Sequence, residues 1–77
     1  MTDKEYAKQV FANRLGRLME ERGITSNDFE DADICCESSI RYYLSGKNTP
    51  NLRTAYAIAR FLGVSLDDLC GDDNYAF

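Results

Sequence analysis

The chain has 77 residues, of which 44% are hydrophobic and 29% charged, and its formal net charge is −4. This fits one small globular domain, and no apolar run approaches the roughly 20 residues of a membrane span. The first residues contain acids and no apolar core of a secretory signal. Three cysteines without Cys-x-x-Cys spacing, and no histidine, argue against a disulfide framework or a zinc site. We therefore expect a cytoplasmic protein with no cofactor, no bound metal and no membrane association.

The first predicted helix covers residues 3–22. Thr2 and Glu5 have the spacing of a capping box at its start. Gly23 can take the left-handed conformation that commonly ends a helix. Between these signals, apolar residues recur at helical intervals: Val10, Phe11, Leu15, Leu18 and Met19.

Two shorter helices follow. Thr25 and Asp28 repeat the capping pattern, and the next apolar residues, Phe29 and Ala32, give that helix a buried face. A third helix is predicted at about 37–45, where Gly46 ends it. Its inward residues should be Ile40, Tyr43 and Leu44.

Pro50 and Asn51 separate the third helix from a fourth. Proline disfavours helix at the residue before it, and asparagine is a good N-cap. The fourth helix should run to Gly63, and Ser65 with Asp68 should open a last short helix that carries Leu66 and Leu69 and closes at Gly71. The apolar stripe of the fourth helix is Leu52, Ala55, Ile58, Ala59 and Leu62.

No segment alternates as a strand would, so the fold class is all-α, a compact five-helix bundle. The domain should span residues 1–71, followed by a short acidic and aromatic tail at 72–77. Two short helices joined by about four residues make a helix-turn-helix pair at about 25–45.

Charge is segregated along the chain. Residues 25–37 carry five acids and no base, whereas residues 38–66 carry four bases and no acid. The basic residues are Arg41, Lys47, Arg53 and Arg60. A purely basic segment in an acidic protein indicates a polyanionic partner at that surface.

The segment "SIRYYLSGKNTPNLRTAYAIARFLGVSLDDL", with "ERGIT" before it, resembles the Cro/cI-like (XRE) family of helix-turn-helix domains. The matching features are the recognition helix, the G-K-x-x-P loop and the LGVS ending. The resemblance implies a lambda repressor-like fold and a DNA-binding transcriptional regulator. It also implies a homodimer that places its third helix in the major groove of double-stranded DNA.

The resemblance also implies the site residues. The base-reading positions correspond to Glu37, Ser38 and Tyr42, whose side chains can contact base edges. Basic side chains, side-chain hydrogen-bond donors and the free backbone N–H groups at the start of a helix can all bind phosphate oxygens. Phosphate contacts are expected from Ser26 and Arg41 by the resemblance, and from Lys47, Asn48, Thr49 and Asn51 by their own chemistry.

The chain departs from the family pattern in several places. Ser26 stands where the family usually has a glutamine that contacts a DNA phosphate, and serine reaches less far. Glu30 replaces a small residue at the point where the second and third predicted helices cross. Ile34 replaces the glycine of the turn between these two helices. Because a β-branched residue resists positive φ, we expect Asp33 to take that conformation instead. Met19 and Leu44 replace both members of a partly buried ion pair, so we expect these two side chains to touch.

Two other interpretations stay open. The chain could be a protein-interaction module, such as an antitoxin or repressor-partner subunit, that binds a protein through its acidic second helix. Cys36 stands at the start of the third helix, where a thiol can have a lowered pKa and sense redox state. Nothing in the sequence indicates an enzyme, since it has no nucleophile–base spacing and no glycine-rich phosphate loop.

Overall fold

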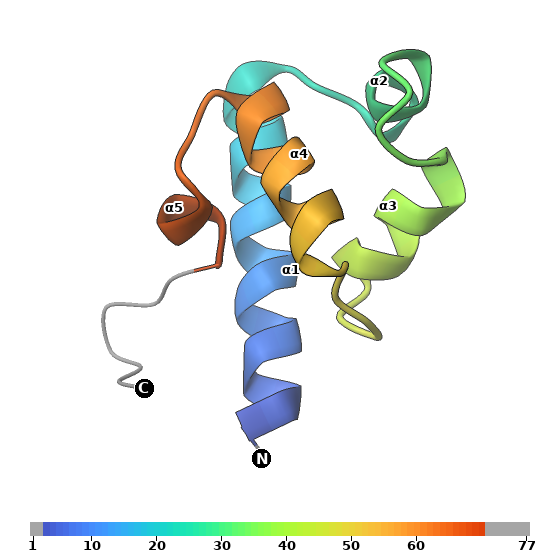
Figure 1. The fold of residues 1–77 in the computed structure, drawn as a ribbon. Coiled ribbons are helices and arrows are strands. Elements are labelled where there is room, and N and C mark those ends of the chain that lie inside the picture. The colour runs from blue at the N-terminus through green and yellow to red at the C-terminus, as the bar shows by residue number, and fades with distance from the viewer. Residues whose placement is uncertain (1–2, 71–77) are drawn as a thin grey trace.

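The structure is a computed structural model that describes residues 3–70, and within that range it is helical with no strand (Figure 1). The predicted all-α class and the order of elements are confirmed. Thr2, Gly71 and the tail at 72–77 lie outside the described residues. The helices are α1 (Asp3–Arg22), α2 (Ser26–Asp31), α3 (Glu37–Leu44), α4 (Leu52–Leu62) and α5 (Leu66–Cys70).

Side-chain caps explain where the later helices begin. The Asp28 carboxylate accepts the backbone N–H of Thr25 at 2.7 Å, before α2. Asn51 Oδ1 accepts the N–H of Thr54 at 2.8 Å, at the start of α4. At α5, Ser65 and Asp68 cap each other reciprocally, at 3.1 and 3.3 Å. Each cap satisfies backbone donors that the first turn of a helix leaves without a partner.

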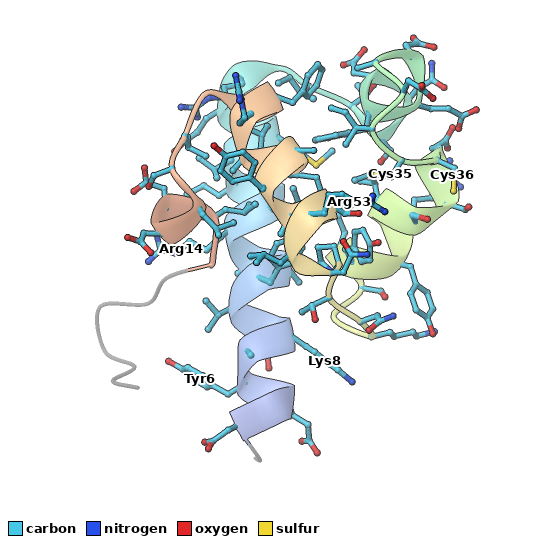
Figure 2. The ribbon with its side chains drawn as sticks, viewed as in Figure 1. Tyr6, Lys8, Arg14, Cys35, Cys36 and Arg53 are labelled. Atoms are coloured by element: carbon cyan, nitrogen blue, oxygen red, sulfur yellow. The ribbon has the colours of Figure 1, made fainter. Side chains whose placement is uncertain are left out.

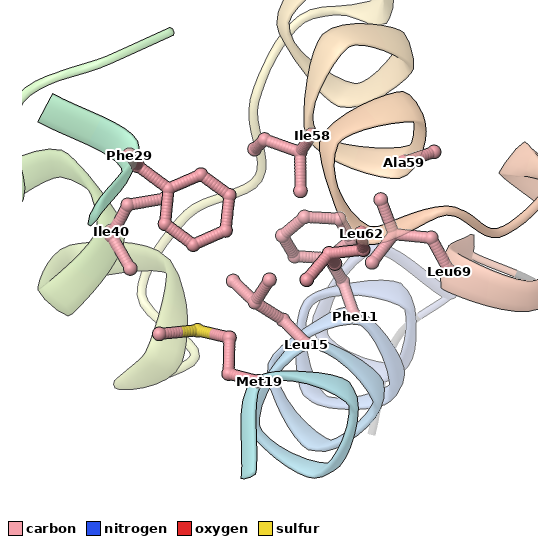
Figure 3. Packing of buried hydrophobic residues seen from close by; sticks show 9 residues of the cluster. All are labelled: Phe11, Leu15, Met19, Phe29, Ile40, Ile58, Ala59, Leu62 and Leu69. Carbon is pink, nitrogen blue, oxygen red and sulfur yellow. The ribbon is translucent and has the colours of Figure 1, made fainter. Parts of the chain in front are cut away.

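The core lies where α1 meets the other helices, and α1 packs against α3, α4 and α5. Phe29 brings α2 into this core, and its ring lies 5.1 Å from that of Phe61 on α4. The Phe11 and Tyr43 rings join α1 to α3 edge to face at 6.1 Å. The buried cluster (Figure 3) consists of Phe11, Leu15, Met19, Phe29, Ile40, Ile58, Ala59, Leu62 and Leu69.

Three residues of the predicted apolar faces, Val10, Ala32 and Leu52, are neither buried nor packed against this cluster. Leu52 is 73% exposed, because it is the first residue of α4 and its side of that turn faces solvent, whereas Ala55 in the same turn is buried. Val10 is only half-buried, since the face of α1 that meets the bundle centres on Phe11 and Leu15. Ala32 is exposed, because it follows the last residue of α2 as its C-cap. These three expectations of burial were wrong. Phe61, which sequence periodicity did not assign to the core, is exposed, and its ring contacts that of Phe29 at the edge of the core.

The turn between α2 and α3 is built around Asp33, which has φ 59° and is the one non-glycine residue with positive φ among those described. The N–H of Asp33 bonds to the carbonyl of Glu30, and the N–H of Ile34 to that of Phe29, both at 3.0 Å. These two bonds define a Schellman motif with its left-handed residue at Asp33. The expectation for Asp33 is confirmed.

Leu44 faces α1, as expected for the residue that replaces one member of the ion pair. Its Cδ2 lies 3.6 Å from the point where a Cβ on Gly16 would stand. It packs against the cluster that contains Met19, which lies one helical turn after Gly16. The two apolar residues therefore both occupy the α1–α3 region, and the direct contact between them stays a prediction.

Candidate nucleic-acid interface

The outward face of α3 presents Ser38 and Tyr42, four residues apart and therefore on one side of the helix. Both are exposed, and half of the Tyr42 surface is open to solvent. They share a shallow hollow of about 320 Å³ with Asn48 of the following loop. The fold thus brings two predicted base-reading residues and one predicted phosphate contact onto one surface.

Glu37 and Arg41, one turn apart on α3, form an ion pair. The guanidinium side chain remains largely exposed, and the carboxylate is more covered. The pair neutralises Arg41 in the free protein, so this residue supplies less net positive charge than the sequence alone suggests. A base or phosphate that engages either residue must compete with the other.

The loop after α3 carries three exposed predicted contacts: Lys47, Asn48 and Thr49. Asn48 Oδ1 accepts the N–H of Thr49 at 2.9 Å, which shapes the loop. Asn51 is exposed, and its side-chain oxygen Oδ1 caps α4. That oxygen is therefore already engaged in a hydrogen bond within the protein. Lys47 is the cationic residue of this group.

Ser26 is the first residue of α2 and is partly covered. In the view of Figure 1, α2 and the α3–α4 loop lie at opposite ends of α3. Ser26 therefore belongs to a separate part of the predicted interface from Lys47, Asn48 and Thr49. Such a separation would suit contacts with phosphates on the two sides of a groove that held α3.

Several acids near this surface have structural roles. The Glu30 carboxylate accepts the backbone N–H of Glu37 at 2.9 Å, and so caps α3 from α2. This explains an acid at a position where a small residue was expected. Asp28 caps α2, and Asp31 Oδ2 accepts a hydrogen bond from Asn27 at 3.5 Å. Local structure thus accounts for much of the acidic segment.

Cys36 occupies the N-cap position of α3, next to the predicted base-reading residues. Its Sγ lies 3.3 Å from Ser38 Oγ and 3.1 Å from Ser39 Oγ. Hydrogen bonds from these hydroxyls, Ser38 first, lower the pKa of the Cys36 thiol to about 7. Partial burial, together with the charge of Cys36, raises the pKa of the neighbouring Cys35 instead, and Cys35 packs against the core.

The bases of α4 lie beyond the loop. Arg53 and Arg60 are seven residues apart and share one face of the helix, and both are exposed. The Arg60 guanidinium carbon lies 5.9 Å from the centre of the Tyr56 ring, within cation–π distance. Figure 2 shows Arg53 at the end of α4 that lies near α3.

Comparison with known families identifies the domain. The family model described as helix-turn-helix, of the Cro/cI (XRE) type, matches residues 15–69. The chain belongs to this family, whose members are DNA-binding regulators. Searches of curated proteins and of solved structures found no match. No helix among the described residues is long and apolar enough to cross a membrane, and no group of potential metal ligands gathers there.

Proposed function

We propose that this protein is a sequence-specific transcriptional regulator that occupies a DNA operator as a homodimer in the cytoplasm. Its mechanism is binding rather than chemical conversion. In each subunit α3 enters the major groove, with Glu37, Ser38 and Tyr42 toward the base edges.

The observation that carries this proposal is the shared surface of α3 and the following loop. Ser38, Tyr42 and Asn48 border one hollow, and Lys47 lies exposed beside them. A surface that combines hydroxyl, amide and ammonium groups beside a helix of groove-reading length suits base edges flanked by phosphates.

The acidic balance of the protein limits the affinity of one subunit. Arg41 is paired with Glu37, and the net charge is −4, so few phosphates are neutralised and little counterion release follows. Two subunits on adjacent half-sites would combine their contacts. We therefore expect salt-sensitive binding that becomes useful only for the dimer.

The alternative interaction module rests on the acidic residues of α2. Asp28 and Glu30 already accept backbone hydrogen bonds that cap α2 and α3. Because these carboxylates have roles inside the domain, their presence is accounted for without a protein partner. This favours the DNA-binding proposal.

The direct test is selection from a randomised duplex library at physiological salt, followed by sequencing. We expect an enriched inverted repeat with half-site centres about one helical turn apart. Lys47→Ala should then weaken binding to every duplex, whereas Ser38→Ala should change the enriched sequence. No enrichment by folded protein would contradict the proposal and favour the interaction module.

A further inference from the structure

A groove of about 540 Å³ separates the amino-terminal half of α1 from the end of α3 and the α3–α4 loop. Lys8, Gln9 and Asn13 line it from α1, and Tyr42 and Lys47 line it from the opposite wall. Figure 2 shows Lys8 pointing away from α1 on the side opposite to Tyr6. Since Tyr42 and Lys47 belong to the predicted DNA surface, the groove continues that surface onto α1.

The groups in the groove suit phosphate oxygens. Two ammonium groups and two side-chain amides can donate hydrogen bonds, and Lys8 and Lys47 approach from opposite walls. Glu5 is the one acid of the lining, so the two lysines outnumber the acids there. The lining therefore favours a chain of anionic groups over an apolar ligand.

The ion pairs of the protein also indicate that this groove suits an anionic ligand. Within the described part of the chain, the recorded ion pairs join Arg22 to Glu21 and Arg41 to Glu37. Neither involves Lys8 or Lys47. Among the described residues, Lys8 and Lys47 therefore form no recorded ion pair with a carboxylate, whereas Arg41, the arginine of α3, is paired with Glu37.

We propose that this groove is a second phosphate-binding track, in which Lys8 and Lys47 hold the DNA backbone immediately outside the half-site that α3 reads. The inference rests on the proposed function and extends it, because it adds Lys8 of α1 to the interface. The length of duplex that each subunit covers then exceeds the length that α3 and its loop cover.

The test compares two duplexes carrying the selected operator, one ending at the half-site edges and one extended by about half a helical turn on each side. Affinity is measured at several salt concentrations for the wild type and Lys8→Ala. The wild type should bind the extended duplex several-fold more tightly. Lys8→Ala should lose this gain, and its salt slope should fall by about 0.9 per subunit, the value for one phosphate contact.

Arg17→Ala is the matched control. It removes one positive charge from the same helix, but Arg17 lines other hollows and not this groove. It should retain the gain from duplex extension. Alanine is the best helix former, so neither substitution should unfold α1, and circular dichroism checks this. Lys8→Arg should keep most of the gain.

The outcomes separate the two proposals. If the wild type binds the operator but Lys8→Ala shows the same dependence on duplex length and salt, the track is wrong and the proposed function stands. If inorganic tripolyphosphate binds through Lys8 while duplex length has no effect, the groove holds a free anion and the DNA assignment is overturned. If the folded wild type binds no duplex, both proposals fail.

Discussion

At the scale of single residues, Cys36 has the most distinctive chemistry of the α3 surface. Hydroxyl groups of Ser38 and Ser39 lie close to its sulfur and stabilise the thiolate, which is the reactive form of cysteine. Its exposure leaves it accessible to reagents, whereas Cys35 packs against the core. The two adjacent thiols should therefore react at very different rates.

We predict that alkylation of Cys36 by iodoacetamide has its midpoint near the pKa of about 7. Cys35, with a raised pKa, should react only at higher pH. Mass spectrometry of peptides labelled across a pH series measures both rates. Ser39→Ala should move the Cys36 midpoint upward, because it removes one hydroxyl donor to the thiolate. A midpoint at the ordinary thiol value in the unaltered protein would contradict this assignment.

Glu37 restrains Arg41 through their ion pair. We predict that Glu37→Gln raises affinity for non-operator duplex several-fold and steepens its salt dependence, because it frees a cation beside the phosphates and removes a repelling carboxylate. Fluorescence anisotropy across a salt series measures both quantities. Glu21→Gln is the control, since it breaks an ion pair at the far end of α1. Equal responses of the two variants would mean that only net charge matters.

At the scale of elements, the α2–α3 turn determines how α3 is presented. Asp33 holds the left-handed conformation, and the Glu30 carboxylate reaches from α2 to the first N–H of α3. The same short segment therefore ends one helix and caps the next. An acid on α2 that looks unfavourable for DNA binding fixes the start of the helix that would read DNA.

We predict that Asp33→Gly stabilises the domain by about 1 kcal/mol, because a non-glycine residue costs about 1–2 kcal/mol in the left-handed conformation and glycine loses part of this gain through its flexibility. Urea denaturation measures the change. Ala32→Gly is the matched control, because Ala32 has φ −84° and gains nothing from glycine. Asp33→Asn separates the effect of charge. Destabilisation by Asp33→Gly would show that the aspartate makes a compensating interaction.

At the scale of the whole molecule, one small core holds five helices together. Phe29 joins α2 to this core and is fully buried. Since α2 has six residues, it is too short to be stable alone, and its position depends on this side chain. The helix-turn-helix pair is therefore a product of tertiary packing.

We predict that Phe29→Ala costs about 3–5 kcal/mol, a large part of the stability of a domain of this size. Thermal unfolding followed by circular dichroism measures the loss. Tyr56→Ala is the control, because Tyr56 is 54% exposed and should cost about 1 kcal/mol or less through its contact with Arg60. Similar losses for the two variants would contradict the central position of Phe29.

Much of the fold follows from local sequence signals. Asn51, Ser65 and Asp68 cap helices where the capping patterns predict, and Gly23, Gly46 and Gly63 have the positive φ expected after a helix. These features depend on residues within four positions of one another, so no distant contact is needed to predict them. The positive φ of Asp33 was predictable from the family resemblance, because Ile34 replaces the turn glycine and resists that conformation.

Other features arise only when distant segments meet. Leu52 is exposed although it continues an apolar stripe, because burial depends on whether another helix covers the position. The cap from Glu30 to Glu37 requires a particular crossing of α2 and α3. Lys8 and Lys47 face one groove across 39 positions of sequence, and no periodicity relates them. The sequence alone determined the helices and the family, and tertiary packing decided which charges share a surface, because that depends on contacts between helices.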